Sequence, residues 1–580
     1  MKISAICRKR SIIVFFSFAI LYLILLLNLF NIQILNQNFY LKLAHDQHTI
    51  SITSYPDRAP IIDRNRKPIT LNRDSVAAFI LPHKLTEPQK LNSFLRKNFP
   101  DAYRRLAQHK NKYFMYVQRR LTPAQQALIK KTNLLDIKLV SEPSRFYLLE
   151  TLAPVIGIAS IDNQGLFGLE RKYNQLLSGE SSIFDLEKDA RSGRFYFKKA
   201  TTQTGTEGQE LQLTIDSELQ FLAASELQET VDTYSAQEGA VVILDPVAGD
   251  VLALVSAPSF DPNQVSKLDL NLTKNRPISE THELGSVMKP FVALAALEEG
   301  VVTPDELIDC GGKKEVMVDG MRITTVLPDG IIPFWQVITR SNNIGMVKVA
   351  KKLGPKLYDY YRKMGFGIKT NLGLEGEQAG FVSHPKNWSN RSIVSLSFGY
   401  EISATLLQLA QAMSLVANHG YLVTPRLILE PGQTPLVPSE VEGWLTKNSQ
   451  STKAKLTDSN SLAPKLLDHK TKRVFSEKTI NQMRKILQEN VQAGTGKKAY
   501  IQGYEIFGKT GTANLVVNGK YSKQHNIYSF VGFVERGSYK RVIAVYVKDS
   551  PQSGLLASMV AAPLFEKIAE KMIIHDKLLN

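Results

Sequence analysis

A serine and a lysine lie one helical turn apart in the stretch THELGSVMKP, residues 281–290. Residues i and i+3 share one face of a helix, so the hydroxyl of Ser286 and the amine of Lys289 are expected to be neighbours. The apolar, alanine-rich residues that follow predict a buried helix. A lysine that is shielded from water can lose its proton and activate such a hydroxyl. The pair therefore predicts a nucleophilic serine with a lysine base.

The same spacing recurs at Ser383 and Lys386. Pro385 disfavours helix at the residue before it, and the surrounding residues are polar, so nothing in this segment buries its lysine. We expect no catalytic role for Ser383.

Two further short motifs follow the first serine–lysine pair. SNN at residues 341–343 precedes a run with helical periodicity, and KTGT at residues 509–512 lies in a strand-like stretch after a glycine-rich turn. The order S-x-x-K, S-x-N, K-T-G is the motif set of penicillin-binding proteins and class A β-lactamases. Each motif alone is a weak signal, whereas three in this order and in fitting local contexts indicate one catalytic site.

Beyond these motifs, the chain resembles the class B penicillin-binding proteins, the monofunctional D,D-transpeptidases that cross-link peptidoglycan. The resemblance covers nearly the whole chain and includes DRAPIIDRNRKPIT, which is similar to the family's R-G-x-I-x-D-R-N-G pedestal motif. TNLGLEGEQAG, SFGYEISATLLQLAQAMSLVANHG and AGTGKKAYIQGYEIFGKTGTA look most like the septal, cell-division branch. The resemblance implies an α+β penicillin-binding transpeptidase fold, an antiparallel sheet flanked by helices beside a helical lobe, with an extended N-terminal pedestal domain.

Acyl transfer from a D-Ala-D-Ala stem peptide needs a nucleophile, a base, an oxyanion site and an anchor for the terminal carboxylate. Ser286 at a helix N-terminus is suited to attack, because backbone N–H groups and the helix dipole favour developing negative charge there. Lys289 can be neutral if it is desolvated and flanked by a second cation, which Lys509 would supply. Ser341 can relay a proton between Lys289 and the leaving or attacking amine. Taken singly, Lys289 could instead be a snorkelling surface lysine and Ser341 an ordinary helix cap.

The remaining motif residues are expected to bind the substrate. Asn343 can hydrogen-bond the peptide amide of the substrate, and Thr510 and Thr512 offer hydroxyls to a carboxylate beside the lysine of their motif. Gly511 belongs to the same substrate-binding stretch. The resemblance implies an oxyanion hole formed by the backbone N–H groups of Ser286 and Thr512, and it implies no metal or organic cofactor.

Several positions depart from the family's pattern. Leu284 stands where the family has proline, Glu401 stands where it commonly has glycine, and Ala404-Thr405-Leu406 stands in place of the family's T-P-L. Ala59 and Arg66 replace glycines of the pedestal motif. None of these residues removes a catalytic atom, but Leu284 and Glu401 could alter β-lactam affinity or partner docking.

The elements that must position the motifs follow from periodicity. A helix is predicted at residues 218–234, before two apolar runs around an Asp-Pro…Gly-Asp turn at 239–260, which is a hairpin signal. Three further strands are predicted within residues 505–549 and a final helix at 557–573. This succession predicts an α+β domain with helices packed on a sheet. Residues 430–475 are polar with weak periodicity and predict a long surface loop.

The N-terminal residues predict a membrane anchor. Residues 11–35 contain no charged residue and are long enough to span a bilayer core. Arg8, Lys9 and Arg10 precede them, so the positive-inside rule places the N-terminus in the cytoplasm and the catalytic body outside. No small-residue cleavage site follows, which favours a retained single-pass anchor in the cytoplasmic membrane over a signal peptide.

The predicted order is a cytoplasmic tail (1–10), a transmembrane helix (11–35), a pedestal domain (36–237) and a transpeptidase domain (238–580). Solvent-facing amphipathic helices are expected at 81–135. The net charge of +17 arises from scattered lysines and arginines without a long basic run, which argues against a nucleic-acid partner. Cys7 and Cys310 would fall on opposite sides of the membrane and could not pair.

The expected partners are peptidoglycan stem peptides, β-lactams as inhibitors, the membrane, and a polytopic glycan polymerase with other division proteins. Elongation-branch enzymes share the three motifs, so an elongation role stays open. A membrane-bound D,D-carboxypeptidase or β-lactamase is a second enzymatic alternative, because hydrolysis needs a positioned water that one sequence does not reveal. A β-lactam sensor or division scaffold is the non-enzymatic alternative, although the short predicted tail leaves no room for a signalling module.

Overall fold

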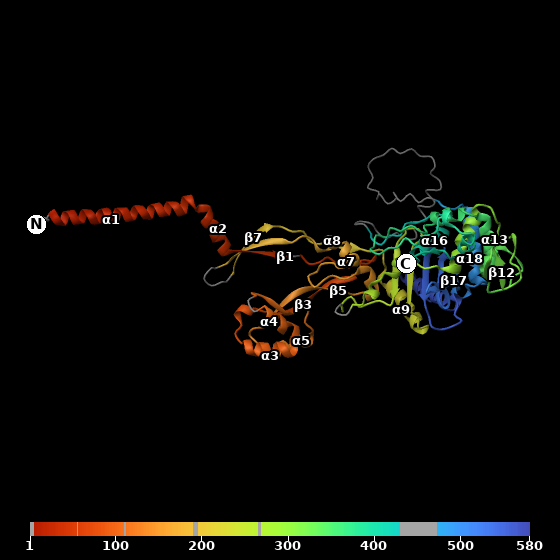
Figure 1. Ribbon diagram of the computed structural model, residues 1–580, viewed down its shortest axis with the longest axis horizontal. Coiled ribbons are helices and arrows are strands. Elements are labelled where there is room, and N and C mark those ends of the chain that lie inside the picture. Colours follow the sequence, from red (N-terminus) through yellow and green to blue (C-terminus); the bar gives the residue numbers. More distant parts are fainter. Residues whose placement is uncertain are drawn as a thin grey trace, which may run out of the picture. The chain divides into compact units, whose positions relative to one another are not determined.

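The computed structural model describes residues 5–54, 56–109, 112–188, 195–264, 268–429 and 473–579 (Figure 1). The chain divides into two compact units, Met1–Arg58 with Ser178–Gln209, and Ala59–Leu177 with Glu210–Asn580. The predicted surface loop at 430–475 lies almost entirely outside the described residues.

The first unit contains the apolar N-terminal helix. α1 (Ala5–Phe30) continues through a π-helical turn, Asn31–Leu35, before α2 (Gln37–His48). The most apolar 18-residue window within Arg8–Leu35 has a mean hydropathy of 2.8, and this is the one helix in the described part of the chain that is long and apolar enough to cross a membrane. The same unit holds an antiparallel sheet of β1 (Thr49–Ser54), β6 (Ser182–Lys188) and β7 (Phe195–Gln203), with β6 in the centre.

The second unit begins with a small lobe of one sheet and three helices. β3 (Thr70–Ile80) lies between β4 (Met115–Gln118) and β5 (Lys138–Tyr147), and α3 (Pro88–Asn98), α4 (Pro100–Gln108) and α5 (Pro123–Thr132) cover one face (Figure 1). Side chains alternate across a strand, so Ala78 and Ile80 of β3 point to the same face and are buried under these helices. The amphipathic helices predicted for residues 81–135 are confirmed.

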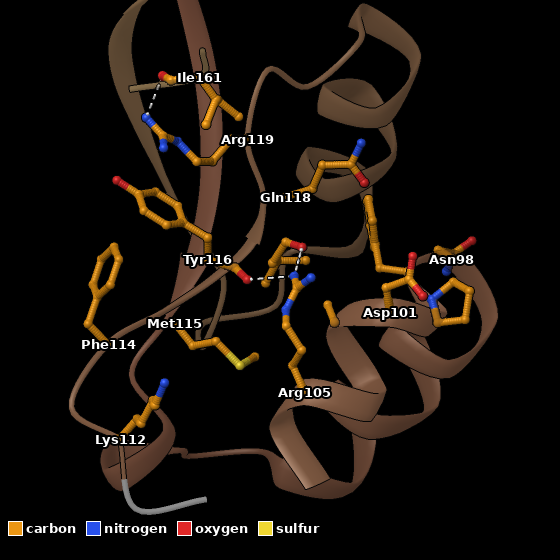
Figure 2. A pocket seen from close by; sticks show the side chains of 14 residues that line it. Asn98, Asp101, Arg105, Lys112, Phe114, Met115, Tyr116, Gln118, Arg119 and Ile161 are labelled. Carbon is orange, nitrogen blue, oxygen red and sulfur yellow. Dashed lines mark hydrogen bonds between the residues drawn. The ribbon is translucent and has the colours of Figure 1, made fainter. Parts of the chain in front are cut away.

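A pocket of about 670 Å³ opens between α4 and β4 in this lobe (Figure 2). β4 is an edge strand, and the pairing of β3 with β4 shifts register beside Tyr116. Arg105 Nη2 donates to the carbonyl oxygens of Tyr116 and Val117 at 3.1 and 3.0 Å. The guanidinium therefore covers part of the exposed strand edge, as edge strands commonly require. None of the predicted catalytic residues lines this pocket.

The pedestal motif ties the start of the second unit to its catalytic body. The buried Asp63 follows β2 (Ile61–Ile62), which pairs in parallel with β8 (Leu211–Gln212). Its Oδ1 accepts the backbone N–H groups of Asn65 and Lys67, both at 2.8 Å, and its Oδ2 accepts the Ser217 hydroxyl at 2.6 Å. Arg66 closes this turn at φ +63°, a conformation that favours glycine, which explains why the family uses glycine at that position.

A five-stranded antiparallel sheet forms the centre of the catalytic body. Its strands are, in order, β10 (Val251–Ala257), β9 (Glu238–Leu244), β19 (Tyr539–Lys548), β18 (Lys520–Arg536) and β17 (Glu505–Val517). α9 (Ser217–Thr233) and α19 (Ala557–Leu579) pack on one face, and α11 (Lys289–Glu298) and α16 (Leu406–Ala417) pack on the other. The predicted hairpin, the three later strands and the final helix are confirmed, and so is the α+β class.

A helical lobe completes the catalytic body. It contains α12 (Phe334–Thr339), α13 (Asn343–Leu353), α14 (Lys356–Lys363), α15 (Ser392–Leu396) and α18 (Glu477–Gln492), whereas the short α10 (Arg276–Ser279) contacts α16 and the sheet. Three short antiparallel strand pairs lie in the same part of the sequence: β11 (Leu307–Asp309) with β14 (Ile331–Pro333), β12 (Glu315–Val318) with β13 (Met321–Thr324), and β15 (Phe381–Val382) with β16 (Ile402–Ser403). Cys310 is buried in this region as a free thiol.

Candidate active site

The first motif lies where a tight turn enters a buried helix. Ser286 is part of a 3₁₀ turn, Gly285–Met288, and Lys289 is the first residue of α11. The backbone N–H of Lys289 donates to the Ser286 carbonyl, so the two residues are one turn apart as predicted. Pro290 occupies the first turn of α11, where it breaks no hydrogen bond. The positive end of the α11 dipole therefore faces the region of the serine.

Lys289 is fully buried, which excludes the surface-lysine interpretation. Its Nζ donates to the carbonyl oxygen of Ser341 at 2.7 Å, to the Ser341 hydroxyl at 3.2 Å and to Asn343 Oδ1 at 2.6 Å. Burial, and then the positive charge of Lys509, hold the pKa of Lys289 well below its ordinary value. The first and second motifs are thus joined directly, and their lysine favours the neutral form that a base needs.

The three residues of the second motif make different contacts. Ser341 has φ +57°, a strained left-handed conformation that turns both its carbonyl and its hydroxyl toward Lys289. The cap of α13 is the neighbouring Asn342, whose side chain accepts the backbone N–H of Gly345 at 3.0 Å. Ser341 is therefore not the helix cap. Asn343 Nδ2 donates to the carbonyl of Thr324 at 2.7 Å, so both ends of this amide are engaged.

The third motif brings a second buried amine to the site. Lys509 Nζ donates to the Thr495 hydroxyl at 3.3 Å and to the Thr510 carbonyl at 3.1 Å. The Thr510 hydroxyl donates to the same Thr495 hydroxyl at 2.9 Å. Burial lowers the pKa of Lys509 to about 7. The amine and two hydroxyls form one polar cluster of the kind that binds a carboxylate.

Gly511 and Thr512 lie on opposite faces of β17. A Cβ added to Gly511 would lie 2.7 Å from the Leu284 carbonyl oxygen and 2.8 Å from the Val287 nitrogen, so β17 packs directly on the serine-bearing turn. The Thr512 hydroxyl instead accepts the backbone N–H of Ala557 at 2.9 Å, at the start of α19. This contact uses the hydroxyl oxygen as an acceptor and leaves its hydrogen available as a donor, so a role for the Thr512 hydroxyl in binding a carboxylate stays a prediction.

The backbone of Thr512 still faces the site. β17 is an edge strand, and the N–H of Asn514 donates to the Tyr400 hydroxyl at 3.2 Å, away from β18. Residues two apart present their backbone groups at the same edge of a strand, so the Thr512 N–H points outward as well. A Cβ on Gly285 would lie 3.0 Å from the Thr512 carbonyl oxygen, which places this edge beside Ser286.

The alternative pair at Ser383 lacks these features. Lys386 is exposed and lies in a short 3₁₀ turn, Pro385–Asn387, rather than in a buried helix. The expectation that this lysine stays in water is confirmed.

The sequence interpretation missed several residues that shape the site. Thr495 and Asn490 support the third motif, since Thr495 donates to Asn490 Oδ1 at 3.1 Å and Asn490 Nδ2 donates to the Gly508 carbonyl at 2.7 Å. Thr495 lies in AGTGKKA, a stretch that resembles the family but that carried no assigned role. Tyr400 lies in a neighbouring loop and accepts the backbone N–H of Asn514. Glu283 lies just before the turn that carries Ser286 and accepts the backbone N–H of Glu401.

Comparisons with known proteins agree with this arrangement. The penicillin binding protein transpeptidase domain matches residues 239–570, and the penicillin-binding protein dimerisation domain matches residues 53–213. The chain is 31% identical to the peptidoglycan D,D-transpeptidase FtsI of Escherichia coli over 460 residues, which cover 78% of this chain and 71% of that protein. It is 29% identical to the stage V sporulation protein D of Bacillus subtilis, over 97% of this chain and 85% of the relative.

Among solved structures, penicillin binding protein 3 from Mycobacterium tuberculosis, complexed with aztreonam, superposes with a TM-score of 0.64 at 24% identity and covers 91% of this chain and 97% of that chain. The likeness at this identity establishes the fold. The transpeptidase domain match extends over more than half of the chain and contains all three motifs. The chain therefore belongs to the class B penicillin-binding proteins and is a peptidoglycan D,D-transpeptidase.

Proposed function

We propose that this enzyme cross-links stem peptides by a serine acyl-transfer mechanism with Ser286 as the nucleophile. The observation that carries the proposal is the buried amine of Lys289, one turn from Ser286 and hydrogen-bonded to the second motif. Neutral Lys289 takes the hydroxyl proton as Ser286 attacks the carbonyl carbon between the two D-alanines of the donor. The C–N bond breaks, and the proton leaves with the terminal D-alanine through Ser341. An acceptor amine then attacks the acyl-serine ester, and the same groups return the proton to Ser286.

Other residues hold the substrate in this proposal. Lys509 and Thr510 anchor the terminal carboxylate, with Thr495 completing the cluster. The backbone N–H groups of Ser286 and Thr512 stabilise the oxyanion, and Gly511 lets the substrate-binding strand approach the nucleophile. Asn343 orients Lys289 and presents its amide to the substrate peptide.

We further propose that β-lactams acylate the same serine and that the protein acts at the division septum. Support comes from the FtsI name of a relative that covers 78% of the chain and from the aztreonam complex of a protein with the same fold. The N-terminus lies in the cytoplasm in this proposal, because Arg8, Lys9 and Arg10 precede the apolar helix. Residues 36–237 then serve as a docking pedestal for a glycan polymerase and other division proteins, and 238–580 catalyse. Elongation remains the alternative cellular role.

The mechanism is tested by labelling with a fluorescent penicillin. Ser286→Ala should abolish the covalent adduct, because losing a nucleophile that acts in a unit costs on the order of 10⁶ in rate. Ser383→Ala is the matched control and should label normally. The lifetime of the wild-type adduct separates the enzymatic alternatives, since a transpeptidase retains it and a β-lactamase releases it rapidly. A labelled Ser286→Ala protein would show that another residue is the nucleophile.

A further inference from the structure

The backbone just before the nucleophile is fastened to a neighbouring turn. His282 and Ala404 exchange backbone hydrogen bonds of 3.1 and 3.0 Å, and the N–H of Gly285 donates to the Gly399 carbonyl at 3.3 Å. A Cβ on Gly399 would lie 2.2 Å from the Gly285 carbonyl oxygen, so the two chains are in direct contact. The position of Ser286 therefore depends on how residues 399–404 are held.

One side chain joins this turn to the nucleophile segment. The Oε1 atom of Glu283 accepts the backbone N–H of Glu401 at 2.8 Å. The same carboxylate interacts with the phenol of Tyr521, near the start of β18. Tyr521 packs edge-to-face against Tyr400 with ring centroids 5.1 Å apart. Glu283 thus contacts three segments that surround the serine: its own turn, the turn at Glu401, and the β17–β18 hairpin.

The surroundings of Glu283 disfavour the ionised form of its carboxyl group. Burial, and the nearby carboxylate of Glu401, raise its pKa, whereas the N–H of Glu401 and the hydroxyl of Tyr521 favour the ionised form and oppose the rise. Tyr400 and Tyr521 are the other titratable groups that face it, and burial raises the pKa of both phenols. Glu401 has φ +57°, a conformation that favours glycine, and the family commonly has glycine at this position. This chain therefore carries a carboxylate in the turn where the family commonly has no side chain.

We propose that the ionised carboxylate of Glu283 is a positioning residue for Ser286, and that the adjacent carboxylate of Glu401 opposes this ionisation. The proposal rests on Ser286 being the nucleophile, as proposed above. Ionised Glu283 accepts from both the N–H and the phenol, and a protonated acid accepts less well. Because the pKa of Glu283 is raised, the ionised form is present above that pKa and disappears as the pH falls through it. Acylation then slows because residues 282–285 keep their backbone bonds to residues 399–404 but lose the side-chain attachment that Glu283 adds.

The test measures the second-order rate constant of acylation by a fluorescent penicillin between about pH 4 and pH 8, a range that spans the ordinary and raised pKa of a glutamate. Glu283→Ala should lower the rate about tenfold at neutral pH, the usual cost of a hydrogen bond to a charged group. Glu283→Gln keeps an acceptor for the N–H of Glu401 and should recover part of that loss. Its pH profile should lack the part of the acid limb that Glu283 causes and keep the part that the deprotonation of Lys289 causes.

Glu401→Gln supplies the decisive measurement. It removes the neighbouring charge and keeps the backbone N–H, so the pKa of Glu283 should fall and the acid limb should move to lower pH. The pKa of Lys289 is lowered by burial and by Lys509, so Glu401→Gln leaves that group unaffected. Glu489→Gln, an exposed position on α18, is the matched control and should superpose on the wild type.

Two results would overturn the inference: a Glu401→Gln profile that coincides with the wild type, or a Glu283→Gln enzyme with an unchanged rate and profile. Thermal unfolding of each variant identifies any loss of fold, and Glu283→Gln and Glu401→Gln remain informative if Glu283→Ala is unstable. Failure of the inference is distinct from failure of the mechanism, because Ser286→Ala alone decides whether the nucleophile is correct.

Discussion

The amines of Lys289 and Lys509 are both fully buried in the active site, and the proposed mechanism requires opposite charge states of them. A base must be neutral, whereas a carboxylate anchor must be charged. Burial lowers both pKa values, and Lys509 lowers that of Lys289 further. Acylation should therefore rise with pH as Lys289 loses its proton and fall again as Lys509 loses its own. The two titrations belong to a coupled pair, so the profile reports the pair rather than either residue alone.

Lys289→Arg should be nearly as damaging as Lys289→Ala, although it keeps the positive charge. An arginine does not give up its proton at any working pH, so it cannot take the proton of Ser286. We expect both variants to acylate at least about 100-fold more slowly than the wild type, the usual contribution of a positioned base. Stopped-flow penicillin acylation checks this. Normal acylation by Lys289→Arg would show that Lys289 acts only through its charge.

Lys509→Arg should retain measurable acylation, and its acylation rate should no longer fall at alkaline pH. With a pKa of about 7, Lys509 is increasingly neutral above pH 7, and the wild-type rate should fall there as the carboxylate of the penicillin loses its partner. Arginine stays charged throughout this range. Rates measured from about pH 7 to pH 9 should therefore decline for the wild type and stay level for Lys509→Arg. An identical decline in both proteins would assign the alkaline limb to another group.

At the scale of elements, the site depends on the contact between β17 and the turn Gly285–Met288. Gly511 is the residue of β17 that permits it, because its missing side chain leaves room for the backbone at Leu284 and Val287. The contact joins a sheet edge to a helix entrance from a distant part of the chain. Since Ser286 lies within this turn and Thr512 follows Gly511, the spacing of the two proposed oxyanion donors depends directly on this contact.

Gly511→Ala should therefore impair acylation out of proportion to its effect on stability. A Cβ only 2.7 Å from a backbone oxygen forces the turn away from β17, and a displacement of about 1 Å at a catalytic centre can cost about 100-fold in rate. Gly330→Ala is the control, because a Cβ there meets nothing within 4 Å. The acylation rate and the melting temperature of both variants are the measurements. A Gly511→Ala enzyme with the wild-type rate would show that the contact tolerates expansion.

At the scale of the whole molecule, the proposed septal role and the proposed chemistry are assigned to different segments. The proposed catalytic residues all lie in the second compact unit, whereas the apolar helix belongs to the first. A transmembrane helix can pack against a polytopic partner through van der Waals contacts without contributing to catalysis. The proposed septal role thus depends on residues that the penicillin assay does not report.

Depletion in a rod-shaped host should block septation and give filaments, with the protein collecting at mid-cell. Exchanging residues 1–35 for an unrelated single-pass anchor should impair this role while penicillin labelling persists. The exchange should stop there, because β1 (Thr49–Ser54) pairs with β6 and belongs to the folded unit. Microscopy and gel labelling of the same strains are the measurements. Round, swollen cells on depletion, with protein along the side wall, would assign it to elongation.

The sequence alone determined the reaction class, the motif residues and the main elements. The spacing of Ser286 and Lys289, the apolar run after them, and the order of the three motifs are local features, and local features are what periodicity and motif chemistry report. For the same reason the hairpin at 239–260, the final helix and the apolar N-terminal helix could be predicted.

The tertiary structure alone decided which groups meet. Lys509 donates to Thr495, Glu283 accepts from Glu401, and the hydroxyl of Thr512 accepts from the backbone of Ala557 at the start of α19. Each of these contacts joins segments that are separate in the sequence, so no periodicity encodes it. The left-handed conformation of Ser341 and the burial of Lys509 likewise arise from packing around them. The sequence names the reacting groups, and long-range packing sets their pKa values and directions, because both depend on neighbours that only the folded chain brings together.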